Sequence, residues 1–209
     1  AALKELSKLA GKQYDAVGKT PAPAASPMLK SAQTGYMKSL KLFADAFAAE
    51  APGAGDGTST QTLEKIRGNA FYKEGVSQAL AGQSAYYASM LKWAATVDPD
   101  VPSDYKPDEA LELSEWKSLP LIVKNVVIAD LMKSGGMLTG YLPQDMTARI
   151  DLFVASGQAD RMKQKTVRSA AELLVGTEAV RSGDFLDNRD RLYGEDEQLP
   201  QLPFFFAGN

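Results

Sequence analysis

The chain has 209 residues, 44% of them hydrophobic and 23% charged, and its formal net charge is −3. This composition is typical of a folded globular protein, and the slight acidity argues against nucleic-acid binding, which needs a basic surface to displace counterions. The chain contains no histidine and no cysteine. Their absence excludes most zinc and iron–sulfur sites, His-ligated haem, and the catalytic triads that depend on an imidazole.

Two helices are predicted in the N-terminal part of the chain. Apolar residues recur at helical spacing over 2–18 and again over 28–50. Between these stretches, Thr20–Pro27 contains three prolines, which deny a helix its N–H donors and its backbone freedom, so we expect a semi-extended linker. The second helix carries a basic strip opposite its apolar stripe, formed by Lys30, Lys38 and Lys41.

A third helix is predicted over 60–96, with a possible N-cap at Thr58 to Thr60. Glycines recur every seven residues within it, at Gly68, Gly75 and Gly82. Each glycine costs a helix about 1 kcal/mol relative to alanine, so we interpret the repeat as a place where a neighbouring helix packs closely.

The C-terminal half begins after a second linker rich in Pro and Asp, at 98–107. Helices are predicted over 119–134 and over most of 144–182, where an amphipathic run that starts at Met146 can bend at Gly157 and a last helix follows from Val167. The first of these is apolar on nearly every side and should be the most buried helix, although Val126–Ile128 alone also fits a strand. Its apolar run is too short to span a bilayer and is interrupted by polar residues.

These elements predict an all-α helical bundle of about five helices, with Pro-rich linkers and an extended C-terminal tail. Residues 1–18 are expected to form an N-terminal helix, 19–183 the bundle, and 184–209 an acidic segment followed by a Phe-rich tail. The chain opens at Ala1 without an initiator Met, which favours an exported or organelle-imported protein whose targeting peptide has been removed.

Residue groups that resemble reactive sites are explained better by ordinary structure. An acidic run offers oxygen ligands to a hard cation but lacks the residue order of a calcium loop; it contains Asp184, Asp187, Asp190, Glu195, Asp196 and Glu197. Ser84 and Ser134 have no histidine to activate them. We therefore expect no catalytic residue, no metal, no cofactor and no enzyme activity.

The strongest candidates for a functional role are docking residues. Phe204, Phe205 and Phe206 stand together near the C-terminus, held extended by the prolines before them, and three adjacent aromatics are rarely left in water. They either cover the protein's own bundle or insert into a partner. The basic strip of Lys30, Lys38 and Lys41 could add contacts to an acidic partner.

In length, composition and architecture the chain resembles the Q-type extrinsic proteins of algal photosystem II. The likeness covers most of the chain, with its histidine-poor helices and Pro-rich connectors, and includes no diagnostic motif. It implies a non-enzymatic accessory subunit that docks from the soluble side on a larger, membrane-associated photosynthetic complex and helps retain the ions of its oxygen-evolving centre. The implied compartment is the thylakoid lumen, with the bacterial periplasm as the alternative.

Two other functions stay open. In the first, the bundle holds a small molecule, a lipid or a pigment, against Tyr86, Tyr87 and Trp93. In the second, the chain is an enzyme that uses carboxylates alone, for which no paired-carboxylate motif gives support.

Overall fold

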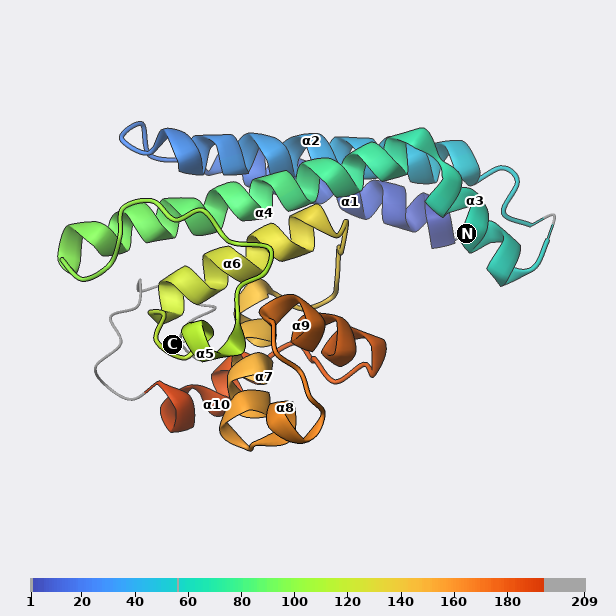
Figure 1. The fold of residues 1–209 in the computed structure, drawn as a ribbon. Helices are drawn as coiled ribbons and strands as arrows, with labels where there is room; N and C mark the ends of the chain where they lie inside the picture. Colours follow the sequence, from blue (N-terminus) through green and yellow to red (C-terminus); the bar gives the residue numbers. More distant parts are fainter. Residues whose placement is uncertain (1, 56, 194–209) are drawn as a thin grey trace. The chain divides into compact units, whose positions relative to one another are not determined.

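A computed structural model describes residues 2–55 and 57–193, and over these residues the chain is all-α (Figure 1). The described residues form ten helices and no strand, and an isolated antiparallel bridge joins Glu112 to Thr166. The predicted all-α fold class is therefore confirmed. The chain divides into two compact units whose boundary in the sequence falls between Tyr86 and Tyr87.

The first unit consists of α1 (Ala2–Lys19), α2 (Pro27–Glu50), α3 (Ser59–Gly68) and the first part of α4 (Ala70–Val97). Helices α1 and α2 pack along each other for most of their length (Figure 1). Both lie within one residue of the bounds predicted from the sequence. Apolar periodicity located them well because each buries one stripe against the other.

The linker between α1 and α2 ends in a helix-starting sequence. The Ser26 hydroxyl accepts a hydrogen bond from the Leu29 backbone N–H at 3.4 Å, which satisfies one of the free donors in the first turn of α2. Pro27 occupies the first turn of this helix, where its missing N–H costs nothing.

The single helix predicted over 60–96 is wrong, because the chain breaks at Asn69 into α3 and α4. Asn69 has an extended backbone, with φ −64° and ψ 132°. Its side-chain oxygen accepts hydrogen bonds from the backbone N–H groups of Phe71 and Tyr72, at 2.9 and 3.3 Å. Asn69 therefore caps α4 instead of continuing α3, a role that asparagine performs better than it fills a helix interior.

The glycine repeat predicts close packing correctly at two of its three positions. A Cβ atom on Gly82 would lie 3.0 Å from the Ala32 carbonyl oxygen of α2, and one on Gly75 would lie 2.8 Å from the Phe43 ring. A Cβ on Gly68 would meet nothing within 4 Å. Gly68 instead ends α3, so the seven-residue spacing there has no packing role.

The second unit contains the rest of α4 and six further helices. These are α5 (Leu113–Trp116), α6 (Leu121–Ser134), α7 (Pro143–Ala155), α8 (Gln158–Arg161), α9 (Val167–Gly176) and α10 (Asp184–Leu192). Helix α7 is the central element, since it packs against α6, α8, α9 and α10.

Helix α6 is the most buried helix of this unit, as predicted. Every residue from Leu121 to Ala129 is buried, and Val126–Ile128 belongs to the helix, so the strand alternative is wrong. Among the helices that the structure describes, none is both long enough and apolar enough to cross a bilayer.

The bend expected at Gly157 within 144–182 is a complete break, and a separate last helix follows from Val167 as predicted. Gly157 has φ 70° and stops α7, and α9 starts afresh at Thr166, whose hydroxyl accepts a hydrogen bond from the Ser169 N–H at 3.2 Å. A left-handed backbone is easily reached by glycine and interrupts any helix that meets it. The first part of the acidic segment also forms a helix, α10, whose Phe185 ring stacks on Tyr193 with centroids 5.6 Å apart.

Candidate functional site

The first unit contains an apolar pocket of about 540 Å³. It is open to solvent and is bordered by the end of α1, the linker, the start of α2 and one residue of α4; its lining residues are Ala16, Val17, Thr20, Pro21, Ala22, Pro23, Leu29, Ala32, Gln33, Tyr36 and Tyr86. The volume lies within the range of small-molecule sites, roughly 300–1,000 Å³. None of these lining residues is charged.

The side chain of Gln33 holds the linker in place as one wall of the pocket. Its amide nitrogen donates to the backbone carbonyl oxygens of Val17 and Thr20, at 2.8 and 2.6 Å, and its amide oxygen accepts from the Ala22 N–H at 3.0 Å. A single side chain thus connects α2 to the last turn of α1 and to two backbone groups of the irregular linker. We refer to the linker segment Thr20–Pro23 as the strap.

Two tyrosines, Tyr36 of α2 and Tyr86 of α4, supply phenol groups to the pocket. Burial raises the pKa of Tyr36 to about 12. Burial also raises the pKa of Tyr86, and the nearby Tyr36 raises it further. Both phenols therefore stay protonated, and able to donate a hydrogen bond, at any physiological pH.

The three aromatics that the sequence suggested for a ligand do not share one site. Tyr86 lines the pocket, whereas Tyr87 is buried in the other unit and donates a hydrogen bond to the Gln144 side-chain oxygen of α7. Trp93 is 38% exposed and lines no part of the pocket. Consecutive helical residues point about 100° apart, so Tyr86 and Tyr87 face different surroundings.

Lys30, Lys38 and Lys41 are all exposed on α2. Lys30 and Lys41 are three helical turns apart and share one side of the helix. The Lys41 ammonium forms an exposed ion pair with Asp45, with 2.6 Å between Nζ and Oδ1. The structure keeps this strip separate from the apolar pocket, whose lining includes none of the three lysines. The other docking residues, Phe204, Phe205 and Phe206, lie outside the described residues.

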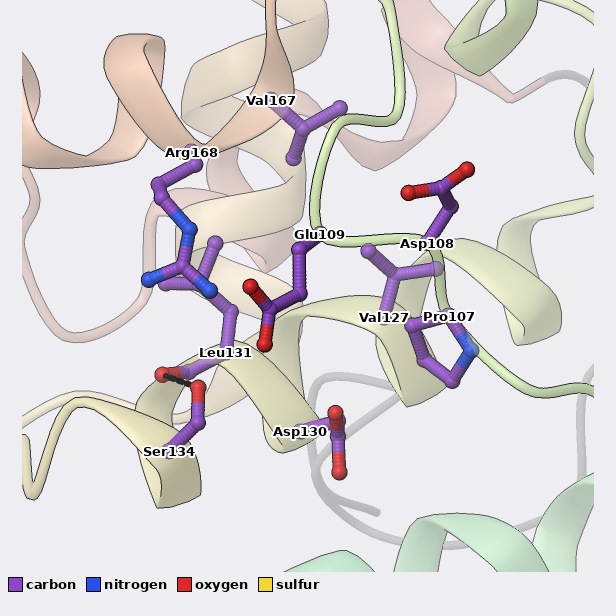
Figure 2. A pocket seen from close by; sticks show the side chains of 9 residues that line it. All are labelled: Pro107, Asp108, Glu109, Val127, Asp130, Leu131, Ser134, Val167 and Arg168. Carbon is purple, nitrogen blue, oxygen red and sulfur yellow. Dashed lines mark hydrogen bonds between the residues drawn. The ribbon is translucent and has the colours of Figure 1, made fainter.

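A much smaller cavity, of about 40 Å³, lies beside α6 and α9 in the second unit (Figure 2). Figure 2 shows Glu109, Asp130 and Arg168 around it, and the Ser134 hydroxyl donating to the Leu131 carbonyl oxygen at 3.1 Å. This volume suits a water molecule or two and is too small for a metabolite. A metal site is not supported either, since in the part of the chain that the structure describes no three acidic side chains are placed to hold an ion.

Asp151 of α7 is the centre of a buried polar network in the second unit. Its Oδ1 accepts hydrogen bonds from Trp116 Nε1 at 2.7 Å and Lys124 Nζ at 3.0 Å, and its Oδ2 accepts from the Tyr193 hydroxyl at 2.7 Å. The Lys124 ammonium also lies 5.4 Å from the centroid of the Trp116 ring. The network joins four separate segments, and none of its residues lines either of the two pockets described in this unit, so a structural role explains it.

The acidic residues around α10 are also engaged in structure. Asp184 is buried and accepts a hydrogen bond from the Arg181 N–H at 2.7 Å, while Asp190 pairs with Arg189 at 2.9 Å. Glu195, Asp196 and Glu197 lie outside the described residues. The Asp190 carboxylate is therefore paired with an arginine and is not left open to a cation.

Asp145 at the start of α7 was missed by the sequence analysis. Its carboxylate accepts hydrogen bonds from the backbone N–H groups of Leu142, Gly183 and Phe185, at 3.0, 3.2 and 3.1 Å. Burial raises the pKa of Asp145, these three donors lower it, and the neighbouring Asp184 raises it; the overall direction is upward. The residue fixes the chain before α10 to the start of α7.

Comparison of the chain with protein-family models, with curated proteins and with solved structures finds no match in any of the three. The apolar pocket is the best-formed candidate site. Sequence patterns indicated Tyr86 but missed Tyr36 and Gln33, which read as ordinary positions of an amphipathic helix.

Proposed function

We propose that this protein binds a small, predominantly apolar molecule in the pocket of its first unit. The observation that carries the proposal is a cavity of about 540 Å³ whose lining residues are uncharged and mostly apolar. Transferring apolar surface from water into such a site contributes about 25 cal/mol per Å². A ligand that buried about 300 Å² there would gain about 7.5 kcal/mol before the cost of immobilisation, so we expect binding weaker than micromolar.

The test uses diphenylhexatriene, a hydrocarbon dye that fluoresces in apolar surroundings. We expect saturable binding to the full chain and a loss of affinity of at least about tenfold in Ala16→Phe, because a bulky ring at this position fills the pocket. Ala16 is exposed at the end of α1, so the larger side chain does not disturb the core.

Ala48→Phe is the matched control, since Ala48 is an exposed helical alanine outside the pocket. Unchanged binding in this variant, together with weakened binding in Ala16→Phe, supports the proposal. Absence of saturable binding, or equal loss in both variants, would contradict it.

We propose a second function, docking as an accessory subunit on a larger membrane-associated complex, as the Q-type extrinsic proteins do in the thylakoid lumen. The specific support is the exposure of Lys30, Lys38 and Lys41 on α2, which offers positive charge to an acidic partner. Photosystem II membranes stripped of their extrinsic subunits are the test material.

For this second function, we expect salt-sensitive binding that weakens when all three lysines are replaced by glutamate. The control replaces Lys65 and Lys73, which are exposed elsewhere in the same unit. Binding that is insensitive to both sets of charges, or no binding at all, would contradict docking through this strip.

A further inference from the structure

The polar groups of the pocket restrict what its ligand can be. No acidic or basic side chain is among the lining residues, so a charged group inside would have no counter-ion. Burying an unpaired charge is far more costly than burying a neutral polar group. A ligand that enters fully is therefore uncharged in its buried part.

The amide of Gln33 is not free to recognise a ligand. Its nitrogen already donates to two backbone carbonyls and its oxygen already accepts from the Ala22 N–H. Disturbing these contacts would release the strap that forms the pocket wall. Recognition has to come from another group.

The Tyr36 hydroxyl is the group best placed for recognition. Tyr36 lines the pocket and is partly buried, and within the described residues its hydroxyl makes no hydrogen bond to the protein. A ligand that covers this phenol removes water from it, and an acceptor on the ligand would replace the lost hydrogen bond. The pKa of Tyr36 is raised, so the phenol stays protonated and can donate to such an acceptor.

We infer that the ligand is a neutral molecule with an apolar body and one carbonyl-type oxygen, which accepts a hydrogen bond from the Tyr36 hydroxyl. The apolar body lies against the alanine, proline and leucine side chains of the strap and of the two helices. This inference rests on the proposed binding function and adds the chemical class of the ligand.

Three probes of equal chain length test it by displacing diphenylhexatriene from the full chain: methyl nonyl ketone, undecane and undecanoate. We expect the ketone to lose about 3- to 10-fold in affinity in Tyr36→Phe, which is the effect of one neutral hydrogen bond. Undecane should be unaffected by this substitution, and undecanoate should bind the unchanged protein most weakly.

Tyr72→Phe is the control. Tyr72 belongs to the same unit but packs outside the pocket against Phe43, with ring centroids 5.4 Å apart. Its variant should leave the affinity for the ketone unchanged.

Each other outcome overturns the inference in a distinct way. If Tyr36→Phe changes the affinities for ketone and undecane equally, while diphenylhexatriene binds normally, the hydrogen bond is absent and the binding function still stands. If undecanoate binds most tightly of the three probes, the pocket prefers anionic ligands and the inference is wrong. Failure of all probes, diphenylhexatriene included, overturns the binding function as well.

Discussion

Gly35 of α2 and Gly82 of α4 face each other so closely that a Cβ atom on Gly35 would lie 2.9 Å from the Cα of Gly82. At both positions an added Cβ would meet backbone atoms, so no change of side-chain rotamer could relieve the contact. The contact sets the separation of the two helices that carry Tyr36 and Tyr86, and so it supports the pocket between them.

Gly82→Ala is therefore expected to destabilise the protein by about 1–3 kcal/mol, despite the better helix propensity of alanine. The new methyl group would lie 3.0 Å from the Ala32 carbonyl oxygen and 3.2 Å from the Tyr36 nitrogen. Urea unfolding measures the change.

The control for this substitution is Gly11→Ala in α1. A Cβ there meets nothing within 4 Å. This variant should gain up to about 1 kcal/mol. A Gly82→Ala protein as stable as Gly11→Ala would show that the two helices can separate freely.

Removing the carboxylate of Asp151 is expected to cost about 3–5 kcal/mol in Asp151→Ala, measured by denaturant unfolding. The side chains of Lys124 and Asp151 are 10% and 12% exposed, so the substitution leaves a buried ammonium without its anion. It also removes the acceptor of the Trp116 indole N–H.

The double variant Lys124→Met/Asp151→Ala should recover much of this loss, because it removes the isolated charge and fills its place with an apolar chain of similar length. Strictly additive losses in the double variant would mean that the ion pair contributes nothing of its own.

The Asp145 carboxyl should make stability depend on pH in a defined direction. Because its pKa is raised above the ordinary 3.8, the folded state binds the proton more tightly than the unfolded state does, and stability from this group rises as pH falls towards 3.8. Asp145→Asn lacks this titration, and it also loses one acceptor for the Leu142 N–H, at a cost of about 1–2 kcal/mol at neutral pH.

The measurement compares the two proteins by chemical unfolding between about pH 7 and about pH 4, where the stability advantage of the unchanged chain should widen on acidification. If the advantage narrows instead, the three backbone donors outweigh burial and the carboxylate is favoured in the folded state.

Tyr36 should weaken the fold at high pH. Its pKa of about 12 lies above the ordinary value of 10.0, so the unfolded chain loses this proton first and stability falls as pH rises above 10. At about pH 11 the free energy of unfolding should have fallen by about 1 kcal/mol more than that of Tyr36→Phe. Unfolding curves of both proteins at about pH 9 and about pH 11 give the difference, and a constant difference would place Tyr36 in contact with water.

The sequence was most informative where a single helix face decides the structure. Residues 2–18 and 28–50 were located almost to the residue, because each buries one continuous stripe. The break at Asn69 was missed, because the apolar spacing continues across it, whereas the bend expected at Gly157 is where α7 stops. At Asn69 the deciding factor is a side-chain oxygen that satisfies the next helix, which periodicity does not register.

The pocket was only partly predictable for a different reason. A cavity exists where side chains fail to fill space, and its walls include small residues such as Ala16, Ala22 and Ala32 from three separate segments. Tyr86 stood out as an aromatic residue, whereas Gln33 acquires its role only when the linker folds back onto α2. The Asp151 network likewise forms only when residues distant in the sequence come together. Lys124 within an apolar run does indicate a buried partner.

The prolines of the strap also explain how irregular backbone can wall an apolar cavity. Pro21 and Pro23 have no N–H group, so Ala22 carries the one amide hydrogen of the segment 21–23, and Gln33 accepts it. The two prolines therefore leave one amide donor in this wall of the pocket, and that donor is already satisfied. The same property makes the Ala22 amide a built-in reporter, since its hydrogen-exchange rate measures how often the strap opens.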